Sequence, residues 1–210
     1  MRITVVGASA GVGRQVVACA VRRGHEVTAL ARSAMAGPDW EGVNPVQGDA
    51  LDPEVLERAL EGAEAVVVAL GTRKNTEKTT LFSDFARVLL NMKRDCDARV
   101  PVLLITGFGA GESAQAAPFI VRLLLRFLLK DVYADKTRME ELVADSDLAW
   151  TLVRPGQLLD TPASGQYRVE TEFHRGMPTR AISRADVAEY CVAQCESQKH
   201  LHTRVGLFGN

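Results

Sequence analysis

The fold is decided by the first stretch of the chain, Met1-Arg2-Ile3-Thr4-Val5-Val6-Gly7-Ala8-Ser9-Ala10-Gly11-Val12-Gly13-Arg14. Residues 3–6 are β-branched, which is typical of a strand, and the small residues after them suit a tight turn. Residues 14–23 then have the apolar spacing of a helix. A strand, a glycine-rich turn and a helix in this order predict the first unit of a parallel sheet.

Further short apolar runs extend this sheet along the chain. They lie at residues 27–30, 45–47, 65–70, 102–106 and 150–153, and helix-like stretches separate most of them. Two of these stretches have clear start signals, Asp52-Pro53-Glu54 and Ser183-Arg184-Ala185-Asp186. The alternation predicts an α/β fold: a single Rossmann-type, doubly wound parallel sheet with helices on both faces.

Length and charge limit the domain organisation and the kinds of partner. A chain of 210 residues, 47% of them hydrophobic, supports one substantial core, so we expect a single domain over residues 1–210. The least regular part, residues 161–179, is expected to shape the substrate end, with substrate-side elements in about 107–135 and 155–182. The net charge of −1 gives no basic face for a phosphate backbone, so we expect no nucleic-acid partner.

One apolar segment, residues 119–130, raises the question of a membrane. It is too short to span a bilayer, and Arg122, Arg126 and Lys130 recur every four residues along it. Packing in the core is the favoured interpretation, with an interfacial helix, a dimer contact and a lid over the substrate as alternatives. The N-terminal apolar run is also too short for a signal peptide, so we expect a cytoplasmic protein without stable membrane insertion. We expect it to be a monomer or a homodimer.

The cysteines and histidines do not point to a metal site. Four cysteines occur in the chain, and the spacing of Cys191 and Cys195 fits a helix, so buried thiols are expected. His174, His200 and His202 have no Cys or acidic neighbours at the spacing of a zinc site, so we predict no bound metal.

The glycine-rich turn predicts a dinucleotide site. Its spacing is G-x-x-x-G-x-G, which departs from the usual G-x-G-x-x-G, but it follows a strand and opens a helix as that site requires. Small residues let the backbone approach a pyrophosphate, and the helix start offers free amides to it. The expected cofactor contacts are Gly7, Ser9, Ala10, Gly11, Val12 and Gly13.

The end of the second predicted strand favours NADP(H) as the cofactor. An acid would bind the ribose hydroxyls of NAD there, but the strand leads into Ala31-Arg32-Ser33. Arg32 and Ser33 can bind a 2′-phosphate, the alternative being that Arg32 is a solvated loop residue. Asp49 can accept from the adenine amino group and Gly71 leaves room for the ribose, although Gly48 and Gly71 can also be turn residues. Further expected contacts at these two strand ends are Ala50, Leu70 and Thr72.

These motifs together resemble the atypical short-chain dehydrogenases, and among them the NAD(P)H-binding group that contains NmrA-like proteins and flavin reductase, also called biliverdin-IXβ reductase. The resemblance covers nearly the whole chain. It is carried by the glycine-rich loop and by Leu30-Ala31-Arg32-Ser33, Gly48-Asp49, Val67-Val68-Ala69-Leu70-Gly71-Thr72-Arg73, Ile105-Thr106-Gly107 and Val153-Arg154-Pro155-Gly156.

The resemblance also implies residues for the nicotinamide end of the site. Thr106 borders the nicotinamide pocket in this family, and Lys136, of a Lys-x-x-x-Glu helix, reaches the nicotinamide ribose or a substrate carbonyl. We therefore predict Thr106 and Lys136 as both catalytic and cofactor-binding. The alternative for Lys136 is an exposed ion pair with Glu140. The segment expected along the nicotinamide is Pro155, Gly156 and Gln157.

Two departures from the family pattern bear on the mechanism. The Tyr-x-x-x-Lys pair of the main short-chain dehydrogenases is one residue shorter here, Tyr133-Ala134-Asp135-Lys136, so that mechanism is not assigned. Flavin reductases carry Thr-Ser at the end of the fifth strand, whereas this chain has Thr106-Gly107.

Our leading hypothesis is an NADPH-dependent reductase that transfers hydride to a planar small-molecule acceptor such as a flavin or quinone. The lack of a recognisable proton relay keeps a second hypothesis open, a non-catalytic NADP(H)-sensing NmrA-like regulatory protein. An isomerase or epimerase acting on a nucleotide-linked sugar shares the fold, but the absent Tyr-x-x-x-Lys pair argues against it.

Overall fold

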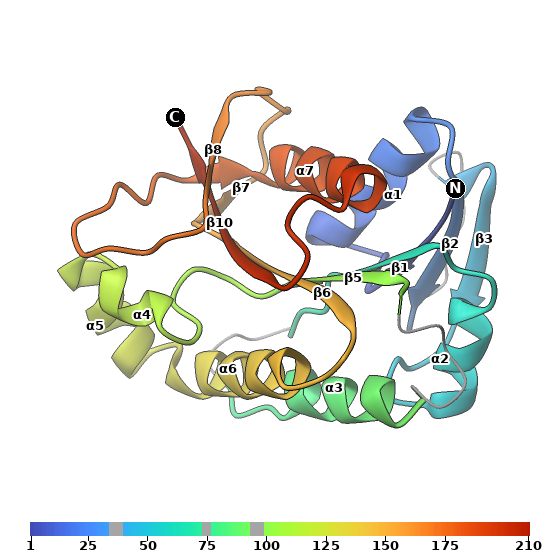
Figure 1. Ribbon diagram of the computed structural model, residues 1–210, viewed down its shortest axis with the longest axis horizontal. Coiled ribbons are helices and arrows are strands. Elements are labelled where there is room, and N and C mark those ends of the chain that lie inside the picture. The colour runs from blue at the N-terminus through green and yellow to red at the C-terminus, as the bar shows by residue number, and fades with distance from the viewer. Residues whose placement is uncertain (34–39, 73–76, 93–98) are drawn as a thin grey trace.

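A single eight-stranded sheet runs through the protein (Figure 1). The structure is a computed structural model that describes residues 1–33, 40–72, 77–92 and 99–210, so Arg73 and Cys96 lie outside the described residues. The sheet order is β3-β2-β1-β4-β5-β6-β10-β8. Its strands are β1 Arg2–Val6, β2 Glu26–Ala31, β3 Val43–Gln47, β4 Ala65–Val68, β5 Pro101–Ile105, β6 Ala149–Pro155, β8 Tyr167–Glu170 and β10 Thr203–Gly209.

The six predicted strands are confirmed as β1 to β6, with ends that differ by one or two residues. All neighbouring strands of the large sheet pair in parallel except β10 and β8, which are antiparallel. The sequence did not lead us to predict β8 and β10, because β8 lies in the irregular region and β10 is interrupted by Gly206. Two short strands, β7 Leu158–Leu159 and β9 Ile182–Ser183, form a separate parallel pair.

Helices cover both faces of the sheet, so the doubly wound fold is confirmed. Helices α1 Gly11–Arg22 and α7 Arg184–Ser197 lie on one face (Figure 1). The opposite face carries α2 Pro53–Leu60, α3 Leu81–Asn91 and α6 Lys130–Ala144. Each face buries its own apolar core, because a β-strand directs alternate side chains to opposite sides.

The two predicted helix start signals are confirmed. The Asp52 side chain accepts a hydrogen bond from the Glu54 amide, with Oδ1 3.0 Å from that nitrogen, and Pro53 is the first residue of α2. The Ser183 hydroxyl accepts from the Asp186 amide at 2.9 Å at the start of α7. In each case a side-chain oxygen binds a helix amide that has no partner within the helix.

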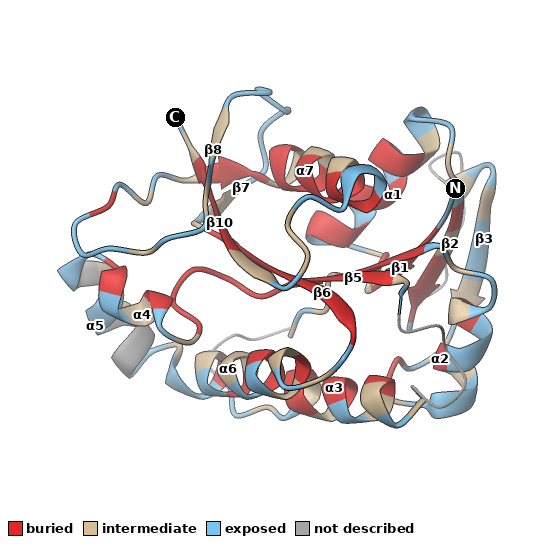
Figure 2. Ribbon diagram, in the orientation of Figure 1, coloured by how far each residue is buried: buried red, intermediate tan, exposed pale blue. Residues whose placement is uncertain are grey.

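The preference for core packing of residues 119–130 is wrong. Helix α5, Phe119–Phe127, follows the short helix α4 Ser113–Ala116 and ends three residues before Lys130, where α6 begins. Phe119 is 75% exposed and Leu123 is 48% exposed. Figure 2 shows exposed surface along α5. An apolar face on a helix indicates that another surface covers it, but the sequence does not show whether that surface is the domain's own core. No helix in the described part of the chain is long and apolar enough to cross a membrane.

A third, smaller apolar cluster lies at the α4 end of the sheet. It joins Phe108, after β5, to Met177 and to Phe208 of β10, and Phe173 and Tyr133 pack against it. The segments expected on the substrate side, 107–135 and 155–182, therefore meet in one cluster.

The cysteines behave as the sequence predicts where they are described. Cys19, Cys191 and Cys195 are free and buried. Burial raises the pKa of Cys19 to about 11 and that of Cys195 to about 12, so these thiols stay protonated at neutral pH.

Candidate active site at the carboxyl edge of the sheet

The carboxyl ends of the seven parallel strands lie at one edge of the sheet. The chain order reverses beside β1, which lies between β2 and β4, and open α/β sheets bind ligands at this kind of switch point. Every predicted site residue except Lys136, which lies on α6, belongs to a loop, a strand end or the first turn of α1 at this edge. They are Gly7, Ser9, Ala10, Gly11, Val12, Gly13, Arg32, Ser33, Asp49, Ala50, Leu70, Gly71, Thr72, Thr106, Pro155, Gly156 and Gln157.

The glycine-rich loop packs closely against the neighbouring strands. The amides of Gly7 and Ala8 donate to the Leu30 carbonyl at 2.9 and 3.1 Å. Gly7 has φ +85°, and a Cβ there would lie 2.6 Å from the Ala69 carbonyl oxygen. A Cβ at Gly13 would overlap the Gly7 carbonyl. Both glycines are therefore needed for the loop to turn from β1 into α1.

The start of α1 has no side-chain cap, unlike the starts of α2 and α7. Ala10 occupies the N-cap position and offers no side-chain acceptor. The first amides of a helix have no partner within the helix, and the helix dipole adds positive potential there. A pyrophosphate fits this cradle, since the loop is small enough for close approach and the amides need acceptors.

Arg32 and Ser33 come directly after β2 and are exposed. The Leu30 carbonyl, which accepts from the glycine-rich loop, lies two residues before Arg32, so the Arg32 backbone lies close to that loop. Asp49 is exposed as well, and one of its carboxylate oxygens accepts from the Leu51 amide at 3.0 Å. A Cβ added at Gly71 would have no atom of the described residues within 4 Å.

Arg184, which the sequence indicated only as part of a helix start, lies beside this loop. Its Nε is 3.9 Å from the position that a Cβ on Gly11 would take. Its Nη1 donates to the exposed Asp160 carboxylate at 2.8 Å. No local signal could have revealed this neighbour, because it depends on the packing of α7 against α1.

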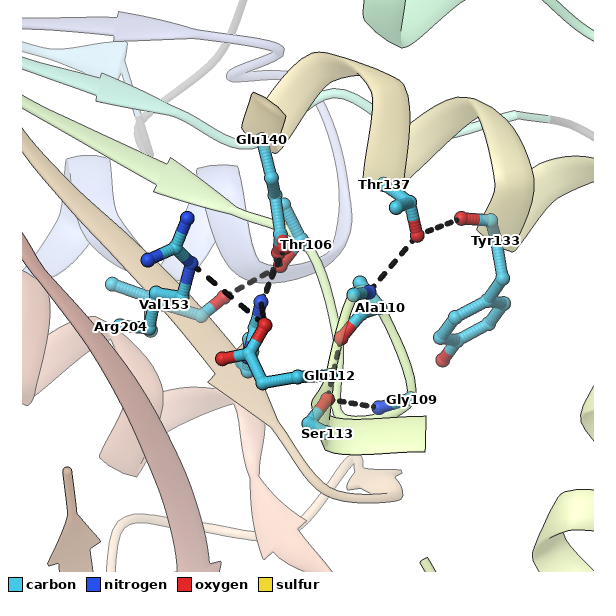
Figure 3. A network of polar contacts seen from close by, with 12 residues as sticks. Thr106, Gly109, Ala110, Glu112, Ser113, Tyr133, Thr137, Glu140, Val153 and Arg204 are labelled. Carbon is cyan, nitrogen blue, oxygen red and sulfur yellow. Dashed lines mark hydrogen bonds and ion pairs between the residues drawn. The ribbon is translucent and has the colours of Figure 1, made fainter. Parts of the chain in front are cut away.

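A buried polar network lies behind the end of β5 (Figure 3). Arg154 donates to Glu140 from Nε at 3.1 Å and from Nη2 at 2.6 Å. It also donates to Glu112 at 2.7 and 3.0 Å. Burial alone would lower the pKa of Arg154, but its hydrogen bonds to the two carboxylates raise it. The Thr106 hydroxyl donates to Glu140 at 2.6 Å.

This network excludes the exposed ion pair between Lys136 and Glu140. Glu140 is 2% exposed, and its carboxylate is bound by Arg154 and Thr106. The Lys136 ammonium instead donates to the Thr106 carbonyl at 2.5 Å. Burial lowers the pKa of Lys136 to about 8, although the charge of Glu140 opposes part of this shift.

Gly107 brings the backbone close to both Lys136 and Tyr133. Its φ is +148°, and a Cβ there would lie 2.9 Å from Tyr133 Oη and 3.7 Å from Lys136 Nζ. Tyr133 and Lys136 are three residues apart on α6 and so share one helix face. The Tyr133 hydroxyl thus occupies the space in which a side chain at position 107 would begin. Spacing alone led us to set Tyr133 aside.

An open cavity of about 450 Å³ adjoins Tyr133. Its wall is held in place by Thr137, whose hydroxyl accepts from the Gly111 amide at 2.9 Å (Figure 3). Ser113 adds a hydrogen bond from the Gly109 amide at 2.9 Å. The lining residues are Gly109, Gly111, Ala114, Gln115, Phe119, Arg122, Leu123, Lys130, Tyr133, Ala134 and Thr137.

The segment after β6 is tied to its neighbours through its backbone. The Pro155 carbonyl accepts from the Phe108 amide at 2.8 Å, and the Gln157 carbonyl accepts from the Ile182 amide at 2.8 Å. Gly156 is close to Phe208, since a Cβ at Gly156 would lie 3.1 Å from that ring. These contacts fix the path of the chain beside the end of β5.

Comparison with known proteins agrees with this fold and identifies the family. The model of a family described as NAD(P)H-binding matches residues 7–198. The 3-diazoavenalumate denitrifying reductase of a Streptomyces species is 32% identical over 184 residues, which are 80% of this chain and 59% of that protein. The chain spans 25% of one curated relative that it matches and 93% of another.

Two solved structures share the fold over the whole chain. The anaerobillin reductase ChuY of Escherichia coli O157:H7 has a TM-score of 0.81 and 21% identity, and the match covers 100% of this chain and 97% of ChuY. A provisionally assigned NADH-flavin reductase of Streptococcus pneumoniae also has a TM-score of 0.81, with 24% identity and 100% of both chains covered. The narrower NmrA-like grouping stays a prediction.

Proposed function

The chain belongs to the NAD(P)H-binding family, and on this premise we propose that it is an NADPH-dependent reductase that passes hydride to a planar small molecule such as a flavin or quinone. One observation carries the proposal: Lys136 and Tyr133 converge on Gly107, at the carboxyl edge that holds the glycine-rich loop and beside an open cavity. A reductase among the relatives, and the reductases that share the fold, support this class of reaction.

Three features at the end of β2 support the choice of NADP(H): the absence of an acid, Arg32 and Ser33. The second strand ends without an acid, and exposed Arg32 and Ser33 follow it. A guanidinium and a hydroxyl suit a 2′-phosphate. We assign the pyrophosphate to the uncapped start of α1, where Arg184 adds a second cation beside Gly11.

The cofactor would supply the hydride, and the chain would hold and orient the reactants. Lys136 is held by the Thr106 carbonyl, and we propose that its ammonium binds the nicotinamide ribose or an acceptor carbonyl. Thr106 then acts as a positioning residue, because its hydroxyl is already donated to Glu140. Tyr133 offers a further hydroxyl at the cavity. The backbone of residues 155–157 is assigned to the nicotinamide.

The test is cofactor oxidation by the purified protein, measured with NADPH and NADH against FMN, riboflavin, quinones and biliverdin, with calorimetric binding of both cofactors. We expect turnover that prefers NADPH. Lys136→Met should lower kcat/KM roughly 10- to 100-fold, the range for a lost hydrogen bond from a charged group, whereas Lys199→Met, at an exposed lysine, should not. Tight NADPH binding without turnover on any acceptor would overturn the reductase and favour an NADP(H)-sensing regulatory protein.

A further inference from the structure

We infer that the cavity beside Tyr133 is the acceptor site, and that it selects acceptors whose planar apolar ring system carries an anionic group, a carboxylate or a phosphate. The inference rests on the proposed function and names its class of substrate. A volume of about 450 Å³ is within the range of small-molecule sites, which is roughly 300–1,000 Å³.

The apolar part of the cavity is open to solvent. Phe119 and Leu123 of α5 line it and are 75% and 48% exposed, and Ala114 and Ala134 add further apolar surface. Large exposed apolar side chains that line a hollow mark a binding surface. Such a surface suits the face of a flat ring system, which would cover these side chains when bound.

The charged side chains that the structure describes in the lining are cationic. Arg122 of α5 and Lys130 of α6 are both exposed and reach the cavity from two different helices. No Asp or Glu is among the lining residues, although the chain as a whole has a net charge of −1. Within the described residues neither cation has an ion pair. Two cations that reach one cavity suit an anionic group on the ligand.

The inner end of the cavity fixes how such an acceptor lies. Tyr133 lines the cavity, and its hydroxyl lies next to Gly107. The Lys136 ammonium lies near Gly107 as well. The reacting edge of the ring therefore lies toward Tyr133 and the anionic group toward Arg122 and Lys130. Helices α5 and α6 follow one another in this region (Figure 1).

The experiment compares acceptors that differ only in the anionic group. FMN and riboflavin share one ring system but differ by a phosphate, and biliverdin and its dimethyl ester differ by two carboxylates. Affinities are measured by fluorescence or absorbance titration in the presence of NADP⁺, so that turnover is not required. The variants are Arg122→Gln, Lys130→Gln and the matched control Arg58→Gln, at an exposed arginine of α2 far from the cavity (Figure 1).

We expect the anionic member of at least one pair to bind more tightly. Each exposed cation should contribute up to about fivefold, so the preference should fall by that factor in either cavity variant and stay unchanged in Arg58→Gln. The pair that responds shows whether phosphate or carboxylate is the ligand group.

Two results would overturn the inference: equal affinity within both pairs, or a preference that both cavity variants retain. A dimer that Leu123→Asp converts to a monomer, with flavin affinity unchanged, would also overturn it by assigning this face to a second copy. Preferential binding without turnover would leave the inference standing and contradict the reductase, whereas turnover without the preference would do the reverse.

Discussion

Arg154 and Glu140 face one another inside the protein, with Nε–Oε1 and Nη2–Oε2 distances of 3.1 and 2.6 Å and side chains that are 0% and 2% exposed. Glu140 also accepts the Thr106 hydroxyl, and the Thr106 carbonyl accepts the Lys136 ammonium. The ion pair therefore holds Thr106 in place, and Thr106 in turn positions Lys136.

Removing one member of this pair should strongly destabilise the fold. Arg154→Leu leaves the Glu140 charge buried without its partner, so we expect a loss of about 3–5 kcal/mol in the free energy of unfolding. Arg87→Leu removes an arginine whose ion pair with Asp84 is on the surface, and it should cost less than about 1 kcal/mol. Urea unfolding of both variants gives the comparison, and equal losses would contradict the role of the buried pair.

Two glycines of the carboxyl edge should respond differently to a methyl group. Gly13→Ala places a Cβ against the Gly7 carbonyl and should destabilise the fold by about 1–3 kcal/mol, as overpacking does. Gly71→Ala meets no atom within 4 Å, so it should leave stability within about 0.5 kcal/mol and weaken only cofactor binding. Thermal unfolding and calorimetry separate the two effects. Unchanged cofactor affinity in Gly71→Ala would remove this glycine from the proposed ribose site.

The pH dependence of turnover should report on Lys136. Burial lowers the pKa of Lys136 to about 8, so the ammonium is present below that pH and is lost above it. If the charged form acts, kcat/KM falls as the pH rises through about 8. A guanidinium stays charged throughout this range, so the fall should disappear in whatever activity Lys136→Arg retains. A wild-type profile that is flat to pH 10 would contradict a role for the charged ammonium.

The strand, glycine-rich turn and helix at the start of the chain could be predicted from the sequence because their signals are local and require neighbours only a few residues apart. The end of β2 without an acid is an equally local signal, and the cofactor that it favours stays a prediction. The buried pair could not be predicted in this way, since Arg154 could as well have been solvated and the sequence suggested only Lys136 as a partner for Glu140. Which partner Glu140 takes depends on the packing of α6 against β6.

The cavity could not be predicted from local signals either, because it also depends on how helices pack. The apolar pattern of residues 119–130 favoured the core, whereas the structure exposes Phe119 and Leu123. Tyr133 was set aside because its spacing to Lys136 departs from the familiar pair. On a helix, however, a spacing of three residues shares a face just as a spacing of four does.

Cofactor choice should depend on Arg32. Arg32→Ala removes the proposed partner of the 2′-phosphate, so NADPH binding should weaken by about 1–3 kcal/mol while NADH binding stays nearly unchanged. Calorimetry with both cofactors measures this, with Arg58→Ala as the control at another exposed arginine. Equal losses of affinity for the two cofactors would show that Arg32 does not bind the 2′-phosphate.

The most direct test of the central claim is the stoichiometry of hydride transfer under anaerobic conditions. NADPH oxidation and FMN reduction are followed together by their separate absorbance bands, without oxygen to recycle the flavin. The account predicts one flavin reduced for each NADPH oxidised, and a slower reaction with NADH. No loss of either band, at protein concentrations at which NADPH is shown to bind, would contradict the reductase.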